Sequence, residues 1–390
     1  MINSKRRFIN GALVGSLLSG TGAFCPMNLF AADRKKGVGG PLLGVNCFDL
    51  FYAPLGRHPN VRSPQARIQE LADHGIPFIR FAASPFWPNE WAKGLGDKDR
   101  FARILDDIME EATKRKVGLI PSLFWYPAAV NYWKGERLAA WGDPKSATMQ
   151  FMREHTAWIV SRYKQSSPVL CWEFGNEFSS HADWPDAVKW WPKLNPAQGT
   201  PTERTDDDRL TTAMVFTAEQ QFLAAVKAAD PNARTTTGND FPRSDAFSGA
   251  KRRKGLDQPQ DLVSSIESLT PPGYDLASVH LYPDRRKARF GQDYINYKQL
   301  LAPINQYFEK RNQSWFIGEF GVPQSGDQDR DQAEFKELLE AVMQTNAKYA
   351  ALWVYDFKPQ ERQWSVTFDG PMAYQLQAIM AANSSRQDSR

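Results

Sequence analysis

The feature that most constrains the fold of this 390-residue chain is an alternation of strand-like and helix-like segments along its length. Short apolar, β-branched and aromatic runs predict strands, and the stretches between most of them have the period of amphipathic helices. The strand-like segments are 42–48, 77–83, 117–124, 169–175, 233–238, 276–281, 315–320 and 350–357. The helix-like segments are 64–74, 100–116, 147–163, 209–229, 297–311 and 332–345. This order predicts an α/β fold, a single (β/α)8 TIM barrel in one domain.

The chain is longer than the roughly 250 residues of a typical barrel, so some loops must be enlarged. The excess falls in residues 181–205, after the fourth strand-like segment, and in residues 241–262, after the fifth. The first of these loops is rich in tryptophan and proline, and the second carries a basic run at 251–254 that we expect to be a solvated loop face. Both loops are predicted on the catalytic face, where long ordered loops wall binding clefts. The last residues, 383–390, are predicted to be a frayed tail.

Residues 1–32 have the pattern of an export signal and are predicted to lie outside the folded domain, which we place at 33–390. A basic head around Arg6 and Arg7 precedes a weakly apolar stretch, 11–24, that is too short to span a bilayer. This segment resembles a twin-arginine signal, and an ordinary secretory signal is the alternative. We therefore predict an exported protein, periplasmic or extracellular, with no stable membrane association after the signal is removed.

Charge and cysteine content narrow the function further. The chain has 48 basic and 44 acidic residues, and the leader holds three basic residues and no acidic one, so the remainder is nearly neutral. That balance argues against nucleic acid as a ligand and permits a neutral polysaccharide or oligosaccharide. Cys47 and Cys171 fall in the first and fourth strand-like segments, which are not neighbours in a barrel, so we expect two buried free thiols. No metal-ligand spacing or cofactor motif is present in the sequence, so we predict neither.

Two glutamates end strand-like segments that are far apart in the sequence. Glu177 closes the run Trp-Glu-Phe-Gly-Asn-Glu, and Glu319 lies in Trp-Phe-Ile-Gly-Glu-Phe-Gly. The carboxyl ends of barrel strands are where catalytic residues are placed. Cleavage of a glycosidic bond needs two carboxylates, one that protonates the leaving oxygen and one that attacks the sugar. The pair therefore predicts a glycosidase; the alternative is that both are buried, ion-paired structural residues.

These motifs, in this order, give the chain a specific likeness. It resembles a retaining glycoside hydrolase of the (β/α)8 clan, most closely family 5, the cellulase and β-mannanase family, over about residues 42–357. The resemblance implies that Glu177 is the general acid/base and Glu319 the nucleophile, with carboxyl groups about 5–5.5 Å apart. It also implies that Asn176 hydrogen-bonds the sugar 2-hydroxyl and that Arg80 holds Glu319 ionised.

Further positions match the family around this pair. His280 and Tyr282 alternate to one face of the sixth strand-like segment, where Tyr282 is expected to bond Glu319 and His280 to bond Glu177 or the sugar. Trp353 matches the tryptophan that stacks under the sugar, because the C–H faces of sugars pack on indole rings. Glu173 is expected as a partner inside the barrel rather than a group that reacts.

The sequence also departs from the family pattern. Phe178 follows Asn-Glu where proline is common, and the third strand-like segment ends in Leu-Phe-Trp-Tyr where many cellulase-type members have histidine. The motif His-Leu-Tyr-Pro-Asp at 280–284 is closer to the β-mannanase branch of the family. The favoured substrate is therefore β-1,4-mannan, cleaved internally. A β-1,4-glucanase, an exo-acting β-glucosidase or β-mannosidase, and a non-catalytic carbohydrate-binding barrel are the alternatives.

Overall fold

The computed structural model describes residues 40–56, 61–164, 168–184, 194–250 and 255–388. The predicted leader, Trp190 and Trp191 of the first enlarged loop, and the basic run 251–254 lie outside these ranges. Within them, none of the helices combines the length and the apolar character needed to cross a membrane.

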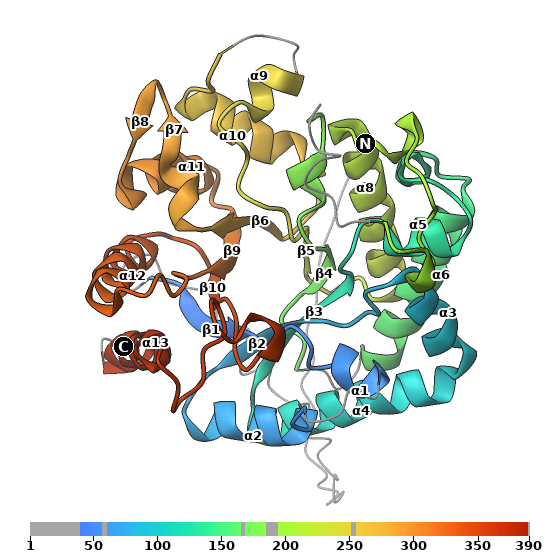
Figure 1. The fold of residues 1–390 in the computed structure, drawn as a ribbon, viewed down its shortest axis with the longest axis horizontal. Helices are drawn as coiled ribbons and strands as arrows, with labels where there is room; N and C mark the ends of the chain where they lie inside the picture. Colours follow the sequence, from blue (N-terminus) through green and yellow to red (C-terminus); the bar gives the residue numbers. More distant parts are fainter. Residues whose placement is uncertain (1–39, 57–60, 165–167, 185–193, 251–254, 389–390) are drawn as a thin grey trace, which may run out of the picture. The chain divides into compact units, whose positions relative to one another are not determined.

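Eight parallel strands close into a barrel, which confirms the predicted (β/α)8 fold (Figure 1). Around the barrel the strands follow the order β1-β10-β9-β6-β5-β4-β3-β2, so β1 pairs with β10 and closes the ring. The barrel strands are β1 (Leu42–Asn46), β2 (Phe78–Ala82), β3 (Gly118–Phe124), β4 (Trp172–Gly175), β5 (Thr235–Thr236), β6 (Leu276–Leu281), β9 (Ser314–Phe320) and β10 (Tyr349–Leu352).

Helices surround the strands, and several begin where the sequence provides a cap. Ser63 accepts a hydrogen bond from the Ala66 N–H and precedes Pro64 at the first helical position. Ser146, just before the helix Ala147–Tyr163, accepts from the Met149 N–H. The longer helices are α2 (Pro64–Asp73), α3 (Pro88–Gly96), α4 (Lys98–Arg115), α6 (Ala147–Tyr163), α8 (Thr212–Ala229), α10 (Pro259–Ser268), α11 (Tyr297–Arg311), α12 (Gln328–Met343) and α13 (Ala373–Asp388). Short helices are α1 (Tyr52–Gly56), α5 (Ala129–Trp133) and α9 (Ala246–Ala250).

The fifth and eighth predicted strands are the ones that differ most from the expected lengths. The fifth is reduced to Thr235–Thr236, although its neighbours still pair with β4 through the bonds from the Trp172 N–H to the Arg234 oxygen and from the Glu177 N–H to the Gly238 oxygen. The eighth ends at Leu352 instead of residue 357, and the peptide bond that follows Trp353 is cis. Beyond Leu352 the chain forms a loop in which Tyr355 and Val366 make an isolated parallel bridge.

The structure also corrects the sequence-based description of three segments. The polar stretch 241–262 contains α9 and the first turn of α10, whose buried Leu262, Val263 and Ile266 are too few to give a long periodic signal. A small antiparallel hairpin, β7 (Lys287–Arg289) and β8 (Gln292–Tyr294), follows β6. The predicted frayed tail is wrong for residues 383–388, because α13 extends to Asp388.

The first residue of that predicted tail anchors the chain to the barrel. The side chain of Asn383 accepts from the Leu43 N–H (3.1 Å) and donates to the Leu43 oxygen (2.8 Å). It thus satisfies both polar groups of one buried β1 residue.

The interior of the barrel is apolar at its amino-terminal end and polar toward the carboxyl ends of the strands. The ring of Tyr349 contacts those of Phe78 (5.4 Å) and Phe316 (6.4 Å), which form an aromatic layer. Phe78 and Arg80 are two residues apart on β2 and so point to the same side, with Arg80 nearer the carboxyl end. Cys47 and Cys171 are buried and free, as predicted.

Candidate active site

Glu177 lies just beyond the end of β4, in a backbone conformation that the neighbouring strand fixes. Its φ is +56°, in the left-handed region, and its N–H donates to the Gly238 oxygen (2.9 Å). Gly238 itself has φ +75°, and a Cβ there would lie 1.9 Å from the Gly175 oxygen. Only glycine permits so close an approach. The ends of β4 and β5 therefore hold Glu177 in one position above the barrel.

Glu319 is brought to the same end of the barrel by an irregularity in strand pairing. Val279 of β6 pairs with Ile317 of β9, but the next residue, His280, pairs with Glu319. This bulge leaves Gly318 without a partner and turns the following side chain, as bulges near active sites do. A Cβ at Gly318 would lie 2.8 Å from the His280 Nε2 atom, so the missing side chain makes room for the imidazole.

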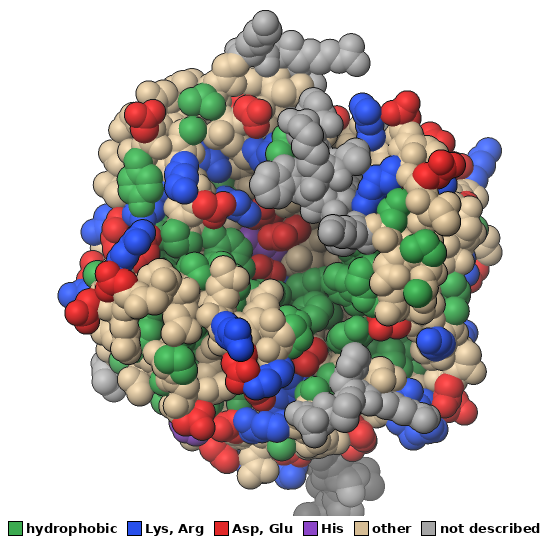
Figure 2. Space-filling model, in the orientation of Figure 1, with side chains coloured by type: hydrophobic (Ala, Val, Ile, Leu, Met, Phe, Trp, Pro, Cys, Tyr) green, Lys and Arg blue, Asp and Glu red, His purple; other side chains and the backbone are tan. Residues whose placement is uncertain are grey.

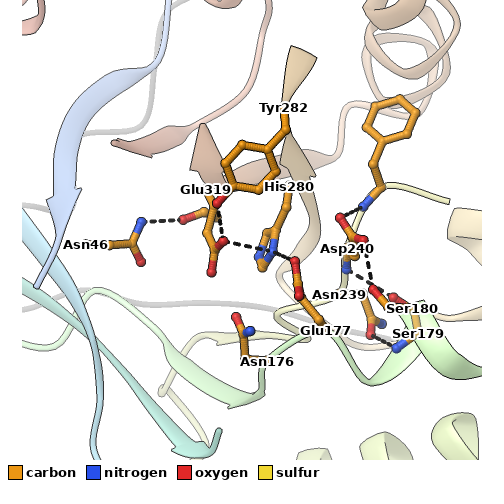
Figure 3. A network of polar contacts seen from close by, with 12 residues as sticks. Asn46, Asn176, Glu177, Ser179, Ser180, Asn239, Asp240, His280, Tyr282 and Glu319 are labelled. Carbon is orange, nitrogen blue, oxygen red and sulfur yellow. Dashed lines mark hydrogen bonds and ion pairs between the residues drawn. The ribbon is translucent and has the colours of Figure 1, made fainter. Parts of the chain in front are cut away.

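The two glutamates converge. One carboxylate oxygen of Glu177, one of Glu319 and a ring nitrogen of His280 all lie within 4.8 Å of one another. Figure 3 shows the imidazole of His280 between the two carboxylates. Retaining glycosidases hold their carboxyl groups about 5–5.5 Å apart, whereas inverting enzymes need roughly 6.5–9.5 Å to admit a water. The observed separation matches the retaining arrangement.

Arg80 lies in the centre of the site and is fully buried. Its Nη1 donates to Glu319 Oε1 (2.8 Å) and to Asn46 Oδ1 (2.9 Å). Its Nη2 donates to Asn176 Oδ1 (2.7 Å), while Nε and Nη2 both reach Glu173 (2.8–3.0 Å). Glu173 thus occupies the interior position expected for it. Since Arg80 takes the Asn176 oxygen, the Asn176 amino group is what remains to donate toward a substrate hydroxyl.

We expect Arg80→Met to destabilise the fold strongly. Removing one member of a buried ion pair leaves the others uncompensated, here Glu173 and Glu319, and lowers the free energy of unfolding by about 3–5 kcal/mol. Urea unfolding monitored by circular dichroism measures this change. Arg209→Met is the matched control, because its ion pair with Asp206 is exposed and contributes about 1 kcal/mol or less. Equal losses in the two variants would contradict the structural role assigned to Arg80.

Tyr282 and His280 contact the carboxylates as the sequence suggested. The Tyr282 hydroxyl donates to Glu319 Oε2 (2.5 Å), so Glu319 receives one hydrogen bond on each oxygen. The His280 Nδ1 atom lies 2.9 Å from Glu177 Oε1 and 3.5 Å from Glu319 Oε2. His280 is fully buried, and burial lowers its pKa, which favours the neutral imidazole.

The surroundings give the two glutamates different proton affinities. Glu177 has 32% of its side chain exposed to the cavity, but protein encloses the rest, and this desolvation, followed by the charge of Asp240, raises its pKa to about 8. Burial also raises the pKa of Glu319, but the positive charge of Arg80 and the Tyr282 hydrogen bond oppose that rise. A protonated Glu177 beside an ionised Glu319 is the division that acid-assisted nucleophilic attack requires.

The same three side chains, Glu177, His280 and Glu319, are also near enough to act as metal ligands. Arg80 and Tyr282 already donate to both oxygens of Glu319, however, and the guanidinium supplies a positive charge where a cation would have to bind. The donor set therefore suits proton transfer and nucleophilic attack better than metal coordination.

A cavity of about 970 Å3 opens above the carboxylates. Figure 2 shows the hollow at the centre of this face, with acidic side chains and histidine at its floor and hydrophobic side chains beside them. Trp353 is half-buried in its wall, where its indole N–H donates to Gln360 (2.9 Å) and its ring stacks on Trp125 (6.1 Å, 22°). Besides Tyr282, the aromatic residues of the wall are Phe48, Tyr52, Phe86, Trp125, Trp353, Phe357 and Trp364.

Several residues of the site were not anticipated from the sequence. Asn46 donates to the Gly318 oxygen (2.9 Å) and accepts from Arg80, so it ties β1 to the bulge of β9. The sequence did offer one signal for Asn46, because it is a polar residue at the end of an otherwise apolar strand. Trp125, in the run that ends the third strand, places its ring centre 4.6 Å from the Arg80 guanidinium. Asp240 and Arg285, discussed below, gave no signal in the sequence.

A closed parallel barrel with two carboxylates facing each other across the carboxyl ends of its strands is the architecture of a glycoside hydrolase. The family model described as Cellulase (glycosyl hydrolase family 5) matches residues 37–359. The chain therefore belongs to glycosyl hydrolase family 5 and is a β-glycoside hydrolase acting on carbohydrate.

Comparison with solved structures supports the same fold. The endo-1,4-β-mannanase of Rhizomucor miehei is 14% identical with a TM-score of 0.60, and the match covers 90% of this chain and 97% of that one. The protein GH5_18 of Streptomyces cattleya in complex with GlcNAc is 14% identical with a TM-score of 0.63, covering 90% and 81%. The Pseudomonas stutzeri endoglucanase Cel5A is 16% identical with a TM-score of 0.51, covering 88% and 94%. A search of curated proteins found no match.

Proposed function

We propose that this protein is an exported retaining β-glycosidase that cleaves β-1,4-linked mannan internally, with Glu319 as the nucleophile and Glu177 as the acid/base. The observation that carries the proposal is the separation of at most 4.8 Å between one carboxylate oxygen of each glutamate. At that distance both groups reach the two ends of one scissile bond, and there is no space for a water between nucleophile and sugar.

The reaction takes two steps in this site. Glu319 attacks the anomeric carbon while Glu177 gives its proton to the leaving oxygen, and a glycosyl-enzyme ester results. Glu177, now ionised, then takes a proton from water, and the hydroxide attacks the same carbon and releases Glu319. Arg80 and Tyr282 hold the Glu319 carboxylate in place between the two steps.

Mannan as substrate is supported by two sequence motifs and by similarity to a solved structure. The run Trp172-Glu173-x-x-Asn176-Glu177 and the run at 280–284 are nearer to the β-mannanase branch, and the Rhizomucor structure is that of a mannanase. The cavity lies at the upper end of the roughly 300–1,000 Å3 usual for ligand sites, and its aromatic wall suits the stacking of more than one sugar ring.

The test is a panel of β-mannans, β-glucans and xylans, with the products sized by chromatography. The proposal expects mixed oligosaccharides from mannan. Mixed oligosaccharides from glucan alone would make the protein a β-1,4-glucanase, and release of single sugars would make it exo-acting. The Glu319→Gln protein, prepared in parallel, controls for contaminating activity. No cleavage of any member of the panel would overturn the substrate assignment.

The pH dependence of kcat/KM follows from the proton affinities of the pair. Activity requires Glu177 protonated and Glu319 ionised, so we expect a bell-shaped profile. The basic limb should fall near pH 8, where Glu177 loses its proton, and the acidic limb reports protonation of Glu319. Initial rates measured from pH 3 to 10 at low substrate concentration give both limbs. A profile that stays flat through pH 9 would contradict the acid role of Glu177.

A further inference from the structure

We propose that an ion pair outside the reacting groups, Arg285 with Asp240, positions Glu177 and sets the pH range in which it can act as an acid. The inference rests on the proposed role of Glu177 as proton donor. Both residues would be positioning residues, since neither contacts Glu319.

Asp240 joins the segments that follow three neighbouring strands. Its Oδ2 atom accepts from the hydroxyl of Ser180 (2.8 Å), which belongs to the turn that Glu177 starts, and from Arg285 Nη2 (2.8 Å), which follows β6. Its own N–H donates to Ser179 Oγ (3.0 Å). Figure 3 shows Asp240, Ser179 and Ser180 gathered on the side of Glu177 that faces away from Glu319. The segment that carries Glu177 is therefore bonded to the β5 and β6 connections.

Arg285 extends this network to the cavity. It lines the cavity together with Glu177 and Tyr282, and its guanidinium lies 5.9 Å from the centre of the Tyr282 ring. The Asp240 side chain is only 8% exposed and that of Arg285 is 25% exposed, so water screens the pair weakly. Arg285 also bonds the exposed Asp284 (2.8 Å).

The two charges act on Glu177 in opposite directions. Asp240 raises the pKa of Glu177, because a second negative charge nearby disfavours the carboxylate, and Arg285 lowers it. In the intact pair these influences offset each other. The other titratable or charged groups that interact with Glu177 come from β2, β6, the connection after β6, and β9: Arg80, His280, Tyr282, Asp284 and Glu319. Of these, Asp284 also bonds Arg285, and its negative charge raises the pKa of Glu177 in the same direction as that of Asp240.

Opposite shifts of the basic limb of the kcat/KM profile are the expected result. Asp240→Asn removes the negative charge that raises the pKa of Glu177 and leaves Arg285 with only the exposed Asp284 as a counter-charge, so the limb should move down by about one pH unit. Arg285→Gln leaves Asp240 uncompensated, so the limb should move up by about one unit. The double variant should fall between them. Rates are measured with β-1,4-mannan, or with whichever polysaccharide of the panel the wild-type protein cleaves.

Arg285→Lys, which keeps the charge, should keep the limb near the wild-type position even if a neutral variant fails to fold. Asp106→Asn and Arg162→Gln are matched controls, because that ion pair has similar bond lengths but lies between α4 and α6. A purely structural role would lower rates in both site variants without opposite shifts. The inference would be overturned if the basic limb did not shift in Asp240→Asn and Arg285→Gln, or shifted in the same direction in both. It would also be overturned if Arg285→Gln changed KM alone. Activity of Glu177→Gln equal to wild type would instead refute the proposed function on which it rests.

Discussion

Glu319→Gln is expected to lower kcat/KM by more than about 10^4-fold and to leave the fold intact. The amide is a very poor nucleophile, so no glycosyl-enzyme ester can form, and losses of this size are typical when the attacking group is removed. The protein should still fold, because Arg80 keeps its bonds to Glu173 and Asn46. Initial rates and thermal unfolding on the same preparation measure both properties.

The matched control for that variant is Glu110→Gln, which makes the same chemical change on the exposed face of α4. It should retain wild-type activity and stability. If Glu319→Gln kept more than a tenth of the wild-type rate on the substrate found in the panel, Glu319 would not be the nucleophile.

Glu177→Ala should lower kcat/KM on a polysaccharide by about 10^2–10^4-fold, the usual contribution of a general acid/base. The loss should be much smaller with a dinitrophenyl glycoside of the same sugar, because that leaving group departs without a proton. Sodium azide should then accelerate turnover, since an anion in the vacated space attacks the glycosyl-enzyme without base catalysis. Mass spectrometry detects the glycosyl azide, and NMR coupling constants at its anomeric centre identify the anomeric form.

Glu154→Ala, on the exposed side of α6, is the control for that experiment and should respond to neither leaving group nor azide. A loss in Glu177→Ala that is equally large for the polysaccharide and the dinitrophenyl glycoside, with no effect of azide, would argue against an acid/base role.

The barrel could be predicted because each of its strands and most of its helices are recognisable from a short stretch of the sequence. Each strand is a short apolar run and most of the helices between them have clear caps, so the periodicity is read within ten to twenty residues. Glu177 and Glu319 were placed together because strand ends meet at one face of a barrel, whatever their distance in sequence. The fifth strand was predicted but keeps only two residues, and the missed helix α10 buries few side chains.

The remaining parts of the site depend on contacts between distant loops. Asn46 and Gly318 are 272 positions apart, and their hydrogen bond arises only because a bulge exposes the Gly318 oxygen. In the sequence, Asp240 has no feature that distinguishes it from other loop residues. Its bonds to Ser180 and Arg285 depend on how the segments after β4, β5 and β6 pack together. A single sequence carries no pattern for such pairs, since neither spacing nor periodicity relates their members.

The stereochemistry of the first product tests the central claim most directly. Proton NMR recorded during the first minutes of hydrolysis, before mutarotation equilibrates the anomers, distinguishes the α from the β hemiacetal of the newly formed reducing end. Attack by Glu319 followed by water on the same carbon inverts that centre twice, so the β anomer should appear first. Initial release of the α anomer would show a single displacement by water and would contradict the roles given to the two glutamates.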